Sequence, residues 1–245
     1  MRRRPLPDPD RIRRRDTLAV GQALTLIADA DPDMLRMAAQ MTEGRRSGSR
    51  VGFTGPPGVG KSSLLRELIR QLRAREETVA LLAADPVSPR SGGAFLGDRL
   101  RFADLTEDEG VFIRSWGHRA PAGDPTPGVV EAASVLEAAG CEWVFFETVG
   151  TGQTETEVLR HMDQKVLVLS PDSGDQYQML KAGSLEAADL YVVNKSDRPG
   201  SESWAEELRG SLARDDFVPT VVLTNALTGK GIAELTAVLS AHPSL

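Results

Sequence analysis

The chain from residue 50 onward alternates short continuous apolar runs with longer stretches whose apolar positions recur every three or four residues. The first kind of run predicts strands buried on both faces, and the second predicts amphipathic helices. We predict strands at residues 50–55, 78–85, 111–116, 143–148, 165–170, 190–195 and 218–224. We predict helices at residues 61–73, 129–138, 179–187, 204–212 and 232–239. This order predicts an α/β fold, with a three-layer, doubly wound and mostly parallel sheet.

Two further periodic stretches precede the first strand and predict a short N-terminal helical extension over residues 17–49. In the first stretch we expect Leu18, Leu24 and Ile27 to lie near one stripe. The second opens with Asp31-Pro32, a capping residue followed by a proline in the first turn. Seven arginines fall within residues 1–16, which we interpret as a flexible tail, with an arm that binds an acidic partner as the alternative.

Composition narrows the class of protein. The 245 residues carry 29 Lys and Arg against 35 Asp and Glu, and the net charge of −6 argues against nucleic-acid binding over the whole surface. No apolar run approaches the roughly 18 residues that a membrane crossing needs, and no apolar segment follows the N-terminal arginines, so we expect a cytoplasmic protein. One cysteine, Cys141, and three histidines predict neither an internal disulfide nor a metal cluster.

Residues 55–62, Gly-Pro-Pro-Gly-Val-Gly-Lys-Ser, match the phosphate-loop pattern G-x-x-x-x-G-K-[ST] between a predicted strand and a predicted helix. Backbone N–H groups in such a loop surround phosphate oxygens, and the helix N-terminus adds its positive end. Lys61 would reach the β- and γ-phosphates, and the Ser62 hydroxyl would bind Mg²⁺. The motif predicts a P-loop nucleotide-hydrolase domain over residues 50–245. The predicted nucleotide contacts are Gly55, Pro56, Gly58, Val59, Gly60, Lys61, Ser62 and Ser63.

The sequence Asn-Lys-Ser-Asp at residues 194–197 ends a later strand and has the N-K-x-D pattern that reads guanine. The Asp197 carboxylate would accept hydrogen bonds from the N1–H and the 2-amino group of guanine. Adenine has neither donor and would leave the carboxylate unpaired. We expect the aliphatic stem of Lys195 to lie over the ring and Asn194 to join neighbouring loops.

A second loop, after the strand at 218–224, is expected to complete the base site. Asn225 and Ala226 lie where GTPases supply a backbone N–H to the oxygen of the base. The residue usually found at the first of these positions is Ser, so the assignment of Asn225 is the less direct one.

Three acidic residues fall where a magnesium–phosphate site needs negative charge. Asp85 and Glu147 end predicted strands, so they point into the ligand crevice at the carboxyl edge of the sheet, and Asp98 lies in the connection between them. Because Mg²⁺ keeps several waters and takes one or two carboxylates, the others would act through water. A turn residue before Pro86 is the alternative for Asp85.

The segment that follows Glu147 resembles a switch loop. The backbone N–H of Gly150 would bond the γ-phosphate and be released after hydrolysis. We therefore predict Lys61, Asp85, Glu147 and Gly150 as the catalytic set. Many GTPases place a water-orienting Gln directly after this glycine, and here that position is Thr151. We therefore predict slow intrinsic GTP hydrolysis without a partner.

With these motifs, the chain resembles the MeaB/ArgK family of P-loop GTPases over roughly residues 17–240. The most specific marks are D-P-V-S with S-G-G-A-F-L-G-D-R-L-R-F, and E-T-V-G-T-G-Q-T-E-T-E. The resemblance implies Mg²⁺-linked roles for Lys61, Ser62, Asp85, Asp98 and Glu147. It also implies a third mobile loop from Asp172 to Lys181.

The family accompanies adenosylcobalamin-dependent acyl-CoA mutases such as methylmalonyl-CoA mutase. The resemblance therefore implies a GTPase chaperone that uses Mg²⁺ and GTP to gate cofactor loading, or protection and reactivation, of such a mutase. No cobalamin site is visible in the sequence. Family members usually continue past the last GTPase helix into a helical arm that builds a homodimer, whereas this sequence stops at Leu245, so we expect a monomer or a homodimer that uses another surface.

Three other functions are considered. A metal-insertion GTPase of the nickel type would carry a Cys/His cluster, which the sequence lacks. A kinase linked to amino-acid transport would need an acceptor pocket with a catalytic base, and no motif indicates one. A GTPase associated with nucleic acid would use the arginine-rich tail and show a steep salt dependence.

Overall fold

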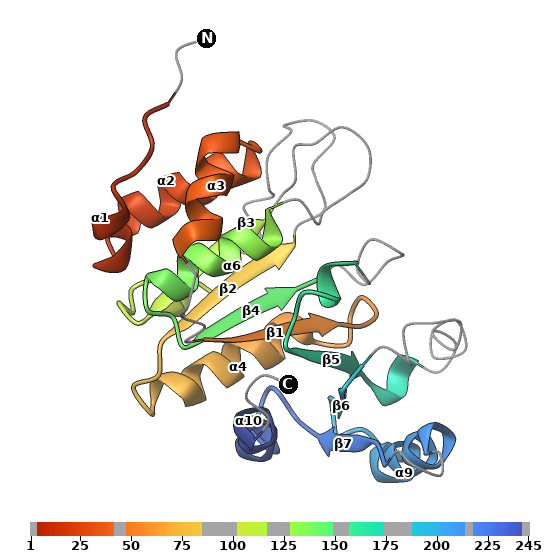
Figure 1. Cartoon of the computed structure of the whole chain (residues 1–245). Coiled ribbons are helices and arrows are strands. Elements are labelled where there is room, and N and C mark those ends of the chain that lie inside the picture. The colour runs from red at the N-terminus through yellow and green to blue at the C-terminus, as the bar shows by residue number, and fades with distance from the viewer. Residues whose placement is uncertain are drawn as a thin grey trace, which may run out of the picture.

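Seven parallel strands form one sheet in the computed structural model, which describes residues 4–41, 48–84, 102–116, 128–148, 157–173, 188–213 and 218–241. The strand order is β3-β2-β4-β1-β5-β6-β7, and every pair of neighbours is parallel (Figure 1). The strands are β1 (Ser49–Thr54), β2 (Val79–Ala84), β3 (Val111–Trp116), β4 (Trp143–Glu147), β5 (Gln164–Leu169), β6 (Leu190–Val193) and β7 (Thr220–Leu223). The predicted doubly wound α/β fold is therefore confirmed.

Helices cover both faces of the sheet. They are α1 (Pro9–Arg13), α2 (Thr17–Ala28), α3 (Pro32–Met41), α4 (Lys61–Arg73), α6 (Val129–Ala138), α9 (Ser201–Leu212) and α10 (Ile232–Ala241), with short 3₁₀ turns η1 (Ala103–Leu105) and η2 (Pro171–Ser173). Helices α4 and α10 pack on one face, and α1, α2, α3, α6 and α9 on the other (Figure 1). The helix predicted at 179–187 lies outside the described residues.

Successive side chains along each strand point to opposite faces of the sheet, so the two faces carry separate buried clusters. In β1, Val51 and Phe53 point to the face that α4 covers, where Leu64 and Leu68 meet them in one buried cluster. In β5, Val166 and Val168 belong to this cluster, whereas Leu167 and Leu169 pack toward α9. Burial on both faces explains why these strands read as continuous apolar runs.

The N-terminal residues correct the expectation of a flexible tail over residues 1–16. Residues 9–13 form helix α1, and the Asp8 side chain caps it by accepting a hydrogen bond from the backbone N–H of Asp10. Ile12 is completely buried against α2 and α6. Because it is a single apolar residue among many arginines, the sequence pattern does not indicate that this segment packs on the domain. Residues 1–3 lie outside the described part of the chain.

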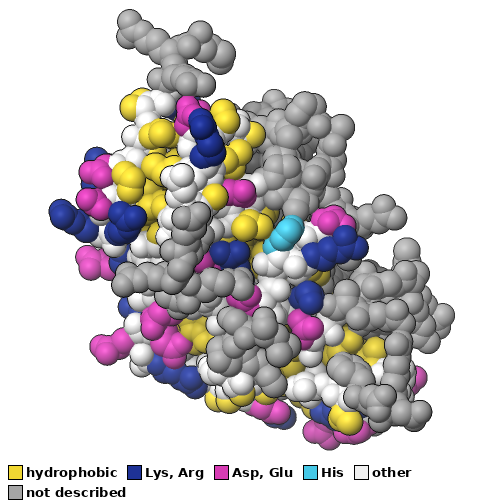
Figure 2. Space-filling view, viewed as in Figure 1, with side chains coloured by type: hydrophobic (Ala, Val, Ile, Leu, Met, Phe, Trp, Pro, Cys, Tyr) yellow, Lys and Arg dark blue, Asp and Glu magenta, His cyan; other side chains and the backbone are white. Residues whose placement is uncertain are grey.

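Helix α2 differs from its predicted face at one position. Leu24 and Ile27 are buried, but Leu18 is 78% exposed. Nine residues separate Leu18 from Ile27, which at about 100° per residue places them on opposite sides of the helix. Figure 2 shows hydrophobic side chains over the surface formed by the N-terminal helices. No helix within the described ranges is both long and apolar enough to cross a membrane.

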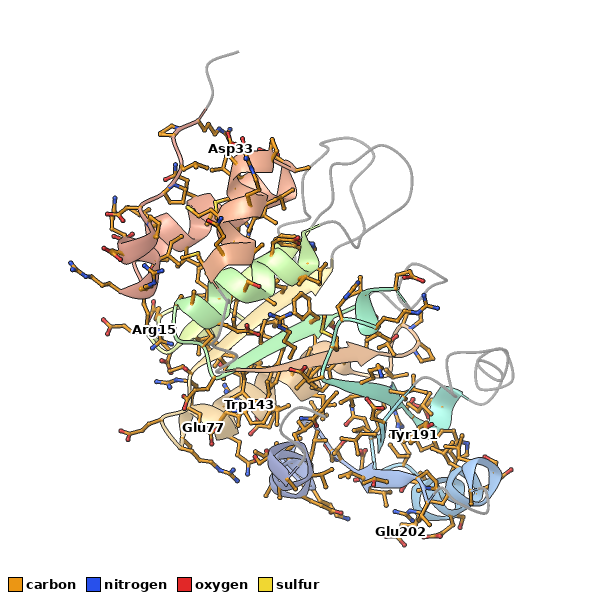
Figure 3. The ribbon with its side chains drawn as sticks, in the orientation of Figure 1. Arg15, Asp33, Glu77, Trp143, Tyr191 and Glu202 are labelled. Atoms are coloured by element: carbon orange, nitrogen blue, oxygen red, sulfur yellow. The ribbon has the colours of Figure 1, made fainter. Side chains whose placement is uncertain are left out.

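The amino edge of the sheet is closed by polar contacts between neighbouring segments. Trp143, the first residue of β4, donates its indole N–H to the Glu77 carboxylate, 2.5 Å away, and the two side chains lie together in Figure 3. The Thr78 N–H donates to Glu142 beside them. These contacts join the segments that precede β2 and β4, which pair in register from Val79 and Trp143 onward. The loops that follow the strands lie at the opposite, carboxyl edge.

Candidate nucleotide-binding site

Four loops that carry predicted site residues leave the sheet at its carboxyl edge. They follow β1 (residues 55–60), β4 (from Thr148), β6 (residues 194–197) and β7 (residues 224–228). Because all seven strands are parallel, these loops lie at one edge, the side to which the arrowheads point in Figure 1. Ligands of open α/β sheets bind in the crevice at this edge.

The loop after β1 has a backbone that only glycine accommodates at two points. Gly55 has φ +140°, and a Cβ there would lie 2.0 Å from the Val168 carbonyl oxygen of β5. Gly60 has φ +92° and is the N-cap of α4, so the loop leads directly into the helix N-terminus. The buried Lys61 side chain crosses the loop and donates to the carbonyl oxygens of Gly55 (2.6 Å) and Pro56 (3.1 Å).

Ser62 and Glu147 form the part of the predicted metal site that the structure describes. The Ser62 hydroxyl donates to Glu147 Oε1 over 2.7 Å, because β4 pairs with β1 and places Glu147 opposite Phe53. Glu147 is 8% exposed and Ser62 is half-buried, so a carboxylate and a hydroxyl meet at a partly buried place beside the predicted phosphate loop. Such hard oxygen donors suit Mg²⁺, which would take its other ligands from phosphate and water.

Other predicted phosphate and metal residues are not placed. Asp85, Asp98 and Gly150 lie outside the described residues. Among the residues that are described, no group of three or more His, Cys, Asp or Glu side chains could hold a metal ion. Burial raises the pKa of the Cys141 thiol, which keeps this cysteine protonated and unsuited to binding a metal.

Asn194 joins three loops of the candidate site, as expected from the sequence. Its side chain is 2% exposed and donates from Nδ2 to the Val59 carbonyl of the phosphate loop (2.9 Å). Its Oδ1 accepts from Thr224 Oγ1 (3.2 Å) and from the backbone N–H of Ala226 (3.1 Å). The phosphate loop and the two predicted base loops are therefore held together by one amide group.

Asn225 makes a different contact from the one expected. The sequence predicts that its loop offers a backbone N–H to the base, but the Asn225 N–H donates to the Lys230 carbonyl. Its side chain instead donates from Nδ2 to Asp197 Oδ1 over 2.8 Å. The same side chain accepts from the N–H groups of Leu227 and Thr228 through Oδ1. Asn225 thus orients the carboxylate predicted to read guanine.

The structure adds two residues that the site prediction omitted. Thr224 is completely buried against Asn194. Asp172, after β5, pairs with Lys195 of the N-K-S-D loop, with 3.3 Å between Oδ2 and Nζ. Asp172 follows a strand at the carboxyl edge, as Glu147 does, and it begins the loop at 172–181 that the family resemblance implies, but no contact with Lys195 was predicted.

These features define the class of protein. A parallel sheet carries a predicted phosphate loop before a helix, a partly buried Ser–Glu oxygen pair beside that loop, and an exposed carboxylate on a connected second loop. This is the arrangement of a P-loop GTPase, with the residues predicted to bind phosphate and those predicted to bind the base both at the carboxyl edge.

A family model described as "Methylmalonyl Co-A mutase-associated GTPase MeaB" matches residues 20–245. The chain therefore belongs to the MeaB family of GTPases and is itself a GTPase, which confirms the resemblance found in its motifs.

Individual relatives agree with this assignment. The chain is 36% identical to the GTPase ArgK of Escherichia coli over 238 residues, 92% of this chain and 72% of ArgK. It is 36% identical to a "probable GTPase" of Mycobacterium tuberculosis over 243 residues, 94% and 72% of the two chains. It is 37% identical to the mouse "Methylmalonic aciduria type A homolog, mitochondrial" over 194 residues, 76% of this chain and 47% of the mouse protein.

Solved structures support the fold. The crystal structure of a "LAO/AO transport system kinase" matches with a TM-score of 0.74 and 28% identity, covering 96% of this chain and 73% of the other. The hydrogenase maturation factor HypB from Archaeoglobus fulgidus matches with a TM-score of 0.59 and 18% identity, covering 89% and 97%. The second likeness shows a shared fold alone.

Proposed function

We propose that this GTPase is Mg²⁺-dependent and acts as a chaperone for an adenosylcobalamin-dependent acyl-CoA mutase. The observation that carries this proposal is the family match over residues 20–245, whose description names methylmalonyl-CoA mutase. The likeness to the mouse methylmalonic aciduria protein supports the same partner. GTP binding and hydrolysis would gate loading of the cofactor, or protection and reactivation of the mutase.

The phosphate end of the site would work through main-chain amides and one buried cation. The N–H groups of residues 58–63 would surround the β-phosphate at the N-terminus of α4. Because the loop backbone itself supplies these donors, the β-phosphate can be bound largely without side chains. Lys61, already held at this loop by two carbonyl oxygens, would turn its ammonium group to the β- and γ-phosphates.

The metal would be held by Ser62, with Glu147 and the predicted Asp85 and Asp98 acting directly or through water. Bound Mg²⁺ would supply charge stabilisation to the transferring phosphoryl group. The hydrogen bond between Ser62 and Glu147 supports this role, because it already places the hydroxyl and a carboxylate side by side. We retain Gly150 as the proposed γ-phosphate contact of the switch loop.

The base end would select guanine through Asp197. Its carboxylate lies exposed and is steered by the amide of Asn225, which leaves its second oxygen for the N1–H and 2-amino donors of the base. Lys195 would cover one face of the ring. Asn194 would transmit changes between the base end and the phosphate end, since it contacts both.

The test is complex formation with an adenosylcobalamin-dependent acyl-CoA mutase from the same organism. Size-exclusion chromatography of the mixture, with GDP and separately with a non-hydrolysable GTP analogue, should give co-elution that depends on the nucleotide. Lys61→Ala serves as the control, because its complex should no longer respond to the nucleotide. Co-elution that is the same with both nucleotides, or no co-elution, contradicts the chaperone proposal.

A second candidate, a kinase linked to transport, is favoured by the likeness to the LAO/AO transport system kinase at 28% identity. The two functions differ in the acceptor of the γ-phosphate. With GTP labelled at that phosphate, a GTPase releases labelled inorganic phosphate, whereas a kinase transfers the label to a protein or a small acceptor. We expect release to water, because none of the sequence motifs indicates an acceptor site.

A further inference from the structure

We propose that Asp172 is a positioning residue for the nucleotide base, which it serves by holding the Lys195 side chain across the base site. This inference rests on the proposed base site and adds a residue that does not belong to the N-K-S-D loop. Two independent observations carry it: the backbone conformation of Lys195 and the ion pair that Lys195 makes.

The backbone of Lys195 is in the left-handed region, with φ +61°. Three other described non-glycine residues have positive φ, namely Arg15, Ala30 and Glu76, and each lies within three residues of the end of a helix, where this conformation is common. Lys195 instead lies in a loop after a strand. A side chain in this region is strained, and such strain is found where a residue is aimed at a ligand.

Hydrogen bonds on both sides maintain this conformation. The Asn194 N–H donates to the Leu169 carbonyl at the end of β5 (2.8 Å), and the Ser196 N–H donates to the Thr224 carbonyl (2.9 Å). The Lys195 carbonyl accepts from the Arg198 N–H (3.0 Å). The loop is therefore fixed to its two neighbours, and the direction of the Lys195 side chain is set by the backbone.

The far end of the Lys195 side chain is fixed by Asp172. Lys195 Nζ lies 3.3 Å from Asp172 Oδ2, and Arg198 Nε lies 3.6 Å from the same oxygen. Asp172 comes from η2, after β5, so the lysine spans from the end of one strand to the end of its neighbour. The backbone and the ammonium group of Lys195 are both restrained. The four methylene groups between them would therefore cover the position predicted for the purine.

The chemistry of this contact predicts an unusual pattern of binding. A lysine stem stacks on the face of any purine, whereas Asp197 reads the edge of guanine. Loss of the Asp172 carboxylate should therefore lower the binding affinity for all purine nucleotides by the same factor and leave the preference for guanine unchanged. Since the Lys195 and Asp172 side chains are 31% and 48% exposed, the factor should be modest and should shrink in high salt.

The experiment measures binding of GDP, IDP and ADP by calorimetry at low and high salt. The variants are Asp172→Asn, Asp172→Glu, Lys195→Met and the double variant Asp172→Asn/Lys195→Met. The matched control is Asp189→Asn, because Asp189 pairs with Lys165 between the same two strands at the opposite edge of the sheet. We expect Asp172→Asn to weaken GDP and IDP binding equally, by about two- to fivefold at low salt. Asp172→Glu should recover most of this loss, and Asp189→Asn should bind like the wild type.

The double variant decides whether Asp172 acts through Lys195. The inference predicts that Asp172→Asn has no further effect once Lys195 is Met. Additive losses, or a fall in the ratio of GDP to IDP affinity with Asp172→Asn, overturn it, because Asp172 would then act on the loop as a whole. If Lys195→Met weakens binding and Asp172→Asn does not, the inference alone fails. If Lys195→Met binds GDP normally, the inference also fails, whereas equal affinity of the wild type for GDP and ADP would contradict the proposed base site itself.

Discussion

At the residue scale, Gly60 is the point where the phosphate loop meets the base loops. Its φ is +92°, and a Cβ there would lie 2.6 Å from Asn194 Nδ2. Asn194 is buried and has partners on both sides, so it cannot retreat without losing hydrogen bonds. Gly58 provides a matched comparison, because its φ is +80° and a Cβ there meets nothing within 4 Å.

We therefore expect Gly60→Ala to destabilise the nucleotide-free protein more than Gly58→Ala. Both variants lose unfolding free energy because alanine is strained in the left-handed region. Gly60→Ala should lose about 1–3 kcal/mol more, because its Cβ displaces the amide of Asn194. Urea unfolding of the two variants measures the difference. Equal losses would show that the amide moves without cost and that the two loops are not tightly coupled.

Asn225 offers a second test at this scale, since its amide donates to Asp197. Asn225→Asp keeps the acceptor that caps Leu227 and Thr228 and replaces the donor with a second negative oxygen. We expect GDP affinity to fall by about tenfold or more, with a smaller ratio of GDP to IDP affinity. Competition binding measures both, with Thr228→Ala as the control in the same loop. A variant that keeps the wild-type ratio contradicts the role of Asn225.

Single residues could be proposed from the sequence where chemistry ties a residue type to a ligand. The glycines of residues 55–60, Lys61 and Asp197 follow from what a phosphate or a guanine requires, whatever surrounds them. Asp172 and the Asn225 side chain could not be assigned, because their partners lie 23 and 28 residues away and are brought near only by the order of the strands.

At the element scale, a buried ion pair joins β1 to α6. Arg50 Nε lies 2.5 Å from Glu137 Oε1, and the two side chains are 7% and 1% exposed. Glu137→Gln would leave the guanidinium buried without a charged partner, and we expect a loss of about 3–5 kcal/mol in unfolding free energy. Glu131→Gln on the same helix is the control, with a loss below about 1 kcal/mol. Chemical denaturation compares them, and similar losses contradict the expectation.

A second pair of elements is joined by Arg73 of α4 and Asp108, which follows η1. The hydrogen bond from Arg73 holds the pKa of the Asp108 carboxyl below its ordinary value of 3.8. The carboxylate therefore stabilises the fold above that value, and this contribution is lost as pH falls through the lower folded-state pKa. We expect Asp108→Asn to lose about 0.5–1 kcal/mol at pH 7.

That loss should shrink toward zero in the acid range, because protonated Asp108 no longer gains from Arg73. Urea unfolding at neutral pH and below pH 3.8 measures the change. Glu109→Gln removes the same charge one position away and is the control. A difference between Asp108→Asn and wild type that does not vary with pH contradicts the assignment.

Elements were predictable where one face of the chain is clearly apolar. The strands and the helix at 61–73 match the structure closely because central strands such as β1 and β4 are buried on both faces and the helix has a single apolar stripe. Helix α1 was missed because one buried residue, Ile12, anchors five residues among many charges. Leu18 was placed wrongly because its residue type was given more weight than its angle on the helix.

At the scale of the whole molecule, the strand order creates the site. β1 lies in the middle of the sheet, between β4 and β5, so the phosphate loop has Glu147 on one side and the base loops of β6 and β7 on the other. The sequence predicts parallel strands but not their order, because the apolar pattern of one strand does not determine which strands pair with it. The motifs therefore predict which loops form the site, whereas the contacts between those loops could be found only in the structure.

The central claim is that one crevice binds a nucleotide by main-chain amides at residues 55–62 and selects guanine through Asp197. The direct test is titration calorimetry of GDP and ADP with Mg²⁺, on the wild type and on Asp197→Asn. We expect the wild type to prefer GDP by about 100-fold or more, and Asp197→Asn to lose most of that preference. Equal affinity of the wild type for GDP and ADP, or an unchanged preference in Asp197→Asn, would contradict the claim.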